Sequence, residues 1–212
     1  MSVRIDKIVT SGTFSLDGGT WEVDNNVYVI GDDRTCLIID PAHDPQAVAD
    51  LVGGREVSAI VLTHGHDDHI RESLATQRLV GGKTYLNPVD TMLWQAVHGD
   101  AKFDEDLHPG DKFTVGDVTL EAVSTPGHSP GSMCLIAPQL GEHGVVFSGD
   151  TLFSGGPGAT GRSYSDFPTI IASIKEKLFP LPDETVVLTG HGDSTTIGAE
   201  RPHLQEWIDR GH

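Results

Sequence analysis

The sequence predicts a mixed α/β (α+β) fold, in which two mixed β-sheets pack together and are flanked on their outer faces by helices. Three observations predict it. Short apolar runs typical of buried strands alternate with segments typical of helices. This alternation occurs in both halves of the 212-residue chain. Four apolar runs also end in a glycine-containing turn next to His or Asp, and two helix-covered sheets would bring those turns to one edge.

The expected elements follow from these runs in chain order. Strands are expected at residues 5–10, 21–30, 35–40, 57–62, 83–86, 112–115, 118–125, 132–137, 144–148 and 185–189. Helices are expected at residues 45–53, 70–80, 89–97, 166–178 and 199–209. The helix over 166–178 has the clearest signals, because Asp166 or Ser165 can cap it and Pro168 suits its first turn. Its apolar stripe, which we interpret as a core face, consists of Ile170, Ile171, Ile174 and Leu178.

Length and composition indicate one globular domain over residues 1–212, large enough to bury a substantial core. No apolar run reaches the length of a membrane span, and the first residues lack the apolar segment of an export signal. Cys36 and Cys134 lie in apolar runs, which favours buried reduced thiols over a disulfide. A cytoplasmic location without a membrane partner is the default expectation. The oligomeric state is left open.

The charge balance argues against a nucleic-acid partner. The chain has 14 basic and 31 acidic residues, a formal net charge of −17. Binding to phosphates needs clustered Lys and Arg, and the sequence has no basic cluster. Bound metal cations would offset part of the acidity, so the charge is compatible with a metal site.

The segment from Thr63 to His69 contains four metal-ligand residue types within six positions: His64, His66, Asp68 and His69. It directly follows the apolar run 59–62, so the ligands would leave the end of a buried strand. Imidazole and carboxylate are the side chains that bind Zn²⁺ and related ions. A solvated polar loop is the alternative for this segment taken alone.

The same pattern occurs three more times. Apolar runs at 122–123, 145–147 and 186–188 lead through glycine-containing turns into His128, Asp150 and His191. Each of these would be weak evidence alone, because Asp150 could cap a helix and a lone His is more often structural. Together they predict seven ligands at the ends of four strands.

These residues resemble the metallo-β-lactamase superfamily over essentially the whole chain. The pattern His64-x-His66-x-Asp68-His69, followed by His128, Asp150 and His191, is similar to the binuclear metal signature of that family. The resemblance implies an αβ/βα sandwich and two zinc ions, with iron or manganese as alternatives at either site. It implies that His64, His66 and His128 hold the first metal. Asp68, His69 and His191 would hold the second, and Asp150 would bridge the two.

Three further segments, 148–153, 161–168 and 190–200, resemble small hydrolases of the glyoxalase II type. The resemblance implies hydrolysis of a small-molecule thioester by a metal-bound hydroxide, with Asp68 as the catalytic residue that orients it. The larger glyoxalase II enzymes have an additional C-terminal helical region for glutathione, which this sequence lacks. Similar actinobacterial hydrolases suggest an S-formyl or hydroxyacyl thioester of mycothiol. Hydrolysis of β-lactams is not expected, because the true β-lactamases usually have Cys where Asp150 stands.

Two other reactions fit the same ligands. A mononuclear iron persulfide dioxygenase resembles this chain and would use only His64, His128 and Asp150. A lactonase would use all seven ligands on a cyclic ester. The glyoxalase II-like segments favour the thioester hydrolase over both.

Arg162 and Tyr164 lie in a glycine-rich segment that follows Asp150. We expect Arg162 to hold Asp150 or its neighbours in place, with pairing to Asp166 as the alternative. Tyr164 could donate to a substrate oxygen, although packing is as good an interpretation of a single tyrosine. The segment itself either admits substrate or is a connection that needs tight turns.

Overall fold

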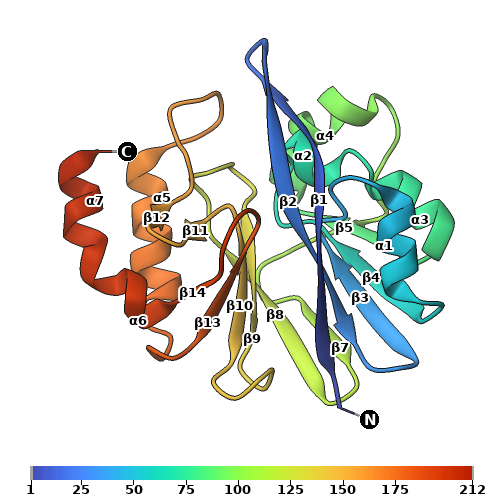
Figure 1. Cartoon of the computed structure of the whole chain (residues 1–212). Helices are drawn as coiled ribbons and strands as arrows, with labels where there is room; N and C mark the ends of the chain where they lie inside the picture. Colours follow the sequence, from blue (N-terminus) through green and yellow to red (C-terminus); the bar gives the residue numbers. More distant parts are fainter. Residues whose placement is uncertain (1, 212) are drawn as a thin grey trace.

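The computed structural model describes residues 2–211, which form two six-stranded mixed sheets with helices on their outer faces (Figure 1). The first sheet consists of β1 (Arg4–Leu16), β2 (Gly19–Gly31), β3 (Thr35–Ile39), β4 (Glu56–Val61), β5 (Thr84–Leu86) and β6 (Glu105–Asp106), in that order. The second consists, from edge to edge, of β14 (Thr195–Thr196), β13 (Val186–Thr189), β10 (Val145–Gly149), β9 (Met133–Ala137), β8 (Val118–Ser124) and β7 (Lys112–Val115). A small separate pair is formed by β11 (Leu152–Phe153) and β12 (Gly156–Pro157).

The helices fall into two groups, one beside each sheet (Figure 1). Beside the first sheet lie α1 (Pro45–Val52), α2 (Asp67–Ile70), α3 (Ser73–Val80), η1 (Pro88–Asp90) and α4 (Thr91–His98). Beside the second lie α5 (Phe167–Ser173), η2 (Ile174–Leu178), α6 (Ile197–Glu200), η3 (Arg201–His203) and α7 (Leu204–Arg210). The layers are therefore helix, sheet, sheet and helix, as the sequence predicts.

Strand β2 shows how the sequence produces these layers. Its side chains alternate in direction, so Tyr28 and Ile30 pack between the sheets, whereas Val27 and Val29 pack toward the helices. All four are buried, because both faces of β2 are covered. The same alternation in the second sheet gives a third apolar cluster around Trp207, beneath α5 and α7.

The β1–β2 hairpin is longer than the sequence analysis predicts. Its pairing continues to Leu16 and Gly19, and the turn between them is Asp17-Gly18 with φ of 53° and 78°. Asp-Gly suits a two-residue turn that needs positive φ at both positions. The polar residues before this turn conceal the strand from a search for apolar runs. The extension matters because Phe14 and Trp21, a cross-strand pair, reach the functional site.

The helix predicted over 70–80 is wrong at its start, since the structure has two short helices in this region. Helix α2 ends at Ile70, and the hydroxyl of Ser73 donates to the Ile70 carbonyl at 2.7 Å. A local side-chain bond of this kind competes with helix continuation. The split places Asp68 and His69 inside α2, directly at the end of the first sheet. The predicted cap is confirmed at the later helix, where Asp166 accepts from the Thr169 amide at 2.9 Å.

Both cysteines are buried and free, as predicted. Within residues 2–211, no helix has the length and apolarity needed to cross a membrane.

Candidate metal centre

Seven side chains from four loops meet at one edge of the two sheets. His64 and His66 follow β4, Asp68 and His69 lie in α2, His128 follows β8, Asp150 follows β10 and His191 follows β13. Six are buried and His191 is half-buried. The structure therefore brings together every residue that the sequence predicts as a ligand.

The first set of three consists of His64, His66 and His128. The Nε2 atom of His64 lies 3.1 Å from Nδ1 of His66, which lies 2.9 Å from Nε2 of His128. Three imidazole nitrogens facing one point at these separations form a site for a metal ion.

The second set consists of Asp68, His69 and His191. Oδ2 of Asp68 is 3.6 Å from Nε2 of His69 and 3.3 Å from Nε2 of His191, and the two nitrogens are 3.3 Å apart. Asp150 lies between the two sets. Its Oδ1 is 3.4 Å from Nε2 of His69, and its Oδ2 is 3.4 Å from Nε2 of His128.

Backbone and side-chain acceptors fix the histidine rings. The Nδ1 atom of His69 lies 2.9 Å from Oδ2 of Asp40, and Nδ1 of His128 lies 2.9 Å from the Ala159 carbonyl. When these nitrogens donate, the Nε2 lone pairs face the centre. Asp40 is not predicted as a functional residue from the sequence, although it follows the apolar run 36–39 just as the ligands follow theirs.

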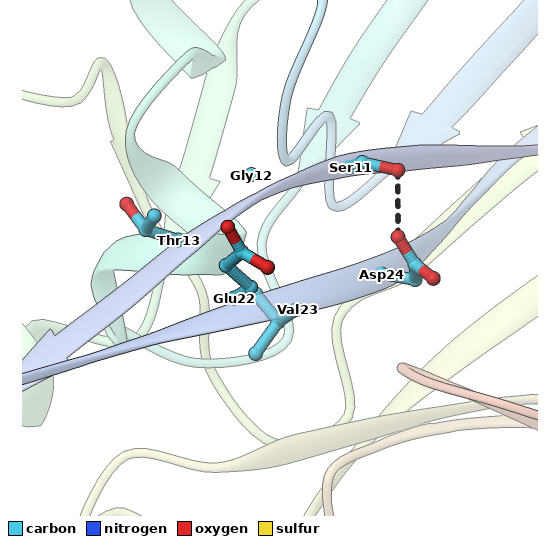
Figure 2. A pocket seen from close by; sticks show the side chains of 6 residues that line it. All are labelled: Ser11, Gly12, Thr13, Glu22, Val23 and Asp24. Carbon is cyan, nitrogen blue, oxygen red and sulfur yellow. Dashed lines mark hydrogen bonds between the residues drawn. The ribbon is translucent and has the colours of Figure 1, made fainter.

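His191 is held by the hairpin. Its Nδ1 lies 2.8 Å from the carbonyl oxygen of Asp24, on β2. The carboxylate of Asp24 accepts a 2.6 Å hydrogen bond from Ser11 on β1, which Figure 2 shows across the hairpin. The contact with Asp24 of the hairpin therefore helps to fix the position of the His191 ring in the second set.

Asp90 joins the two loops that supply the first set. Its carboxylate accepts from the Gly65 amide at 2.8 Å, from the Ser129 hydroxyl at 2.7 Å and from the Gly131 amide at 2.7 Å. Burial raises the pKa of Asp90, although these bonds oppose the shift. Its sequence neighbourhood, Pro88 to Thr91, carries no signal of this role.

The donor set fits divalent metal ions. Buried Nε2 of His66 and Oδ1 of Asp150 have no hydrogen-bond partner among the described residues, although buried polar atoms are normally paired. Burial lowers the pKa of His66 to about 3, so its ring is neutral and able to bind a metal. Burial would raise the pKa of Asp68, but His69 and His191 lower it to about 2, so its carboxylate is ionised.

The centre opens into a cavity of about 240 Å³. Phe14 and Trp21 of the hairpin form one wall, and Phe14 contacts the His66 ring at 5.3 Å between centroids. The guanidinium of Arg162 stacks 3.7 Å from the centre of the Trp21 ring. One wall of the cavity is therefore apolar, and the positively charged Arg162 lies at the mouth of the cavity.

Arg162 and Tyr164 differ in position from the seven ligands. Arg162 lines the cavity through its stacking on Trp21, and no described contact joins it to Asp150 or Asp166. Tyr164 is 53% exposed, with φ of 71°, and does not line the cavity. The Ser163 amide between them donates to Asp17 at the hairpin tip at 3.0 Å, so this loop and the hairpin meet above the site.

The fold and the metal centre define a class of protein. The model of the metallo-beta-lactamase superfamily matches residues 20–191, and the chain belongs to that superfamily.

Three proteins illustrate what this chain is similar to in sequence or in structure. Hydroxyacylglutathione hydrolase GloC of Haemophilus influenzae is 30% identical over 185 residues, covering 80% of this chain and 86% of that protein. The BLEG-1 B3 metallo-beta-lactamase has a similar structure, with a TM-score of 0.73, 30% identity and coverage of 92% of this chain and 97% of that one. TTHA1623, solved in a di-iron-bound form, has a TM-score of 0.74, 29% identity and coverage of 91% and 97%.

Proposed function

We propose that the protein is a binuclear metal-dependent hydrolase of the glyoxalase II type that cleaves the thioester of an S-acylated thiol. The observation that carries this proposal is the position of Asp150. Its Oδ2 lies 3.4 Å from Nε2 of His128 in the first set and 3.3 Å from Nε2 of His191 in the second, and its Oδ1 lies 3.4 Å from Nε2 of His69, so this one carboxylate reaches both sets of donors. The similarity to GloC supports a thioester as the substrate.

Two bound metal ions would supply an activated water and polarise the acyl carbonyl. The chain's own residues account for the rest. Asp68 stays ionised, lines the cavity, and can orient the attacking water and accept its proton. Phe14 and Trp21 hold the acyl group in an apolar environment that limits access of bulk water. A thiolate leaves without a strong general acid, and the cavity lining provides none.

We propose mycothiol as the carrier thiol and a formyl or hydroxyacyl group as the acyl part. Among the described residues that line the cavity, Arg162 is the one Lys or Arg side chain. A largely uncharged sugar thiol suits this cavity better than a carrier with two carboxylates. Zinc is the proposed metal at both sites, with iron or manganese as alternatives, and the cytoplasm is the proposed location.

The test is thiol release from matched acyl thioesters of mycothiol and glutathione, using protein loaded with zinc, iron or manganese. Release of thiol from the mycothiol ester supports both thioester hydrolysis and mycothiol as the carrier thiol. Release from the glutathione ester alone would make glutathione the carrier thiol instead. An Asp150→Ala variant should lose turnover and metal while retaining its circular dichroism spectrum. Turnover by metal-depleted Asp150→Ala would contradict the proposal.

The same protein should be assayed against a lactone, a β-lactam and a persulfide with oxygen uptake. The β-lactam belongs in this panel because of the similarity to BLEG-1. A mononuclear iron dioxygenase would use His64, His128 and Asp150, and would leave the second set of donors unused. If the protein binds one iron per chain and takes up oxygen with the persulfide, the dioxygenase replaces the hydrolase as the proposed function.

A further inference from the structure

Asn25 lies against the second set of donors, although it is not one of the seven predicted ligands. Its Nδ2 atom is 3.1 Å from Oδ2 of Asp68, 3.4 Å from Nε2 of His69 and 3.5 Å from Nε2 of His191. The three donors are themselves 3.3 to 3.6 Å apart. Four atoms with six such separations form a nearly regular tetrahedron. Neighbouring donors bound to one ion at 2.0–2.2 Å lie roughly 3.0 to 3.5 Å apart, whether the ion has four ligands or more.

The amide of Asn25 is incompletely bonded as it stands. The side chain is fully buried, and its Oδ1 has no hydrogen-bond partner among the described residues. Buried amide oxygens are normally paired, so the unpaired Oδ1 indicates a missing partner, and Nδ2 is the amide atom that faces the three donors. A half-turn of the terminal amide exchanges Oδ1 and Nδ2 without moving the rest of the side chain.

The position of Asn25 in β2 is also unusual. It lies on the same face of the strand as Val27 and Val29, which are fully buried and pack toward the helices. A polar residue that continues an apolar row needs a specific partner to offset its burial. Asp68 alone does not satisfy this need, because it bonds only the nitrogen of the amide.

We propose that Asn25 binds the second metal ion through Oδ1, as a ligand additional to Asp68, His69, His191 and Asp150. The inference rests on the binuclear site proposed above. An N–H group directed at a cation would be repelled, so metal binding turns the amide and directs its oxygen to the ion. Carbonyl oxygens suit harder ions, so of the two sites the second is the one that would more readily accept iron or manganese, the alternatives to zinc. The second site would therefore bind hard metal ions better than the first site does.

The substitution Asn25→Asp tests this proposal by the sign of its effect. A ligand oxygen that gains a negative charge should bind the second ion more tightly. If Asn25 instead only donates an N–H to Asp68, then Asn25→Asp sets two carboxylates against each other and weakens the second site. Asn25→Ala is less informative, because either role predicts a loss of roughly 10- to 100-fold in affinity.

The measurement is competition of the protein with a chelator for Mn²⁺ and Co²⁺, which gives the affinity of each equivalent without any substrate. The visible spectrum of the second Co²⁺ reports its coordination number, which should fall in Asn25→Ala. Asn87→Asp is the matched control, because Asn87 is also buried but bonds Val89 and Met133 away from the centre.

We expect a tighter second equivalent in Asn25→Asp and unchanged affinities in Asn87→Asp. Weaker or unchanged binding of the second ion by Asn25→Asp would overturn the proposal while leaving the binuclear site intact. Binding of a single equivalent by the unmodified protein would overturn both. Thermal melting of the metal-free variants separates these outcomes from a failure to fold.

Discussion

The carboxylate of Asp40 joins a metal-ligand ring to the loop that precedes it. Its Oδ2 accepts from Nδ1 of His69 at 2.9 Å and from the Thr63 hydroxyl at 2.6 Å, and its Oδ1 accepts from the Thr63 amide at 2.7 Å. Asp40 therefore fixes the direction of His69 Nε2 and the path of the chain into His64. One residue outside the two sets of donors thus bonds a member of the second set and the residue that precedes the first.

Replacing Asp40 by Asn should weaken the second metal site more than the first. The amide keeps one oxygen and tolerates the φ of 48° at this position, but it removes the charge that favours His69 as a donor. We expect a loss of about 10- to 100-fold in affinity for the second ion, measured by chelator competition. Equal losses at both sites would show that Asp40 acts mainly through Thr63.

Arg162→Ala should change substrate binding and leave metal content unaffected. The guanidinium stacks on Trp21 at the cavity mouth and has no described contact with Asp150. Removing it should raise KM by about 5- to 30-fold, the equivalent of about 1–2 kcal/mol, because the cavity mouth loses its cation and Trp21 loses its stacking partner. Arg34→Ala, an exposed arginine far from the cavity, is the control. Loss of metal from Arg162→Ala would restore the role that the sequence predicts for it.

Loading the second site should release protons, whereas loading the first should release few. Burial alone would lower the pKa of His191, but Asp150 and Asp68 raise it to about 10. The same kind of contact with Asp150, Asp68 and Asp40 raises the pKa of His69 despite its burial. His191 therefore carries a proton at pH 8 in the metal-free protein, and the raised pKa of His69 favours its protonated form, so both rings must be neutralised to bind an ion.

Affinity for the second ion should rise with pH up to about pH 10 and then level off, as His191 becomes neutral. At the first site, burial lowers the pKa values of His64 and His66, so their rings are already neutral. Titration calorimetry in two buffers of different ionisation enthalpy gives the protons released per ion. A His191→Ala variant that released as many protons as the unmodified protein would contradict this account.

The sequence predicts which seven side chains meet at the centre, because their signal is local. Each follows an apolar strand, and strand ends in a mixed sheet meet at one edge. The sequence does not predict the roles of three other residues at the centre, Asn25, Asp40 and Asp90. Asn25 lies inside a strand and not in a turn at a strand end, so it lacks the local pattern that marks the predicted ligands. Asp90 acts through two loops, around Gly65 and Gly131, that only the folded chain brings together. The hairpin that carries Phe14 and Trp21 is concealed by its polar residues, although its Asp-Gly turn is a recognisable signal.

Asp90→Ala should reduce both stability and affinity for the first metal ion. The substitution leaves the Gly65 amide, the Ser129 hydroxyl and the Gly131 amide without their shared acceptor. Unpaired buried donors cost about 1–3 kcal/mol each, and a small side chain also leaves room for the two loops to shift. Because Gly65 lies between His64 and His66, that shift should weaken the first site more than the second. Asp90→Asn keeps one acceptor oxygen and should recover part of both losses. The checks are the melting temperature of the metal-free variants and the affinity of each metal equivalent. A variant that melts lower but binds both ions normally would restrict Asp90 to a role in folding.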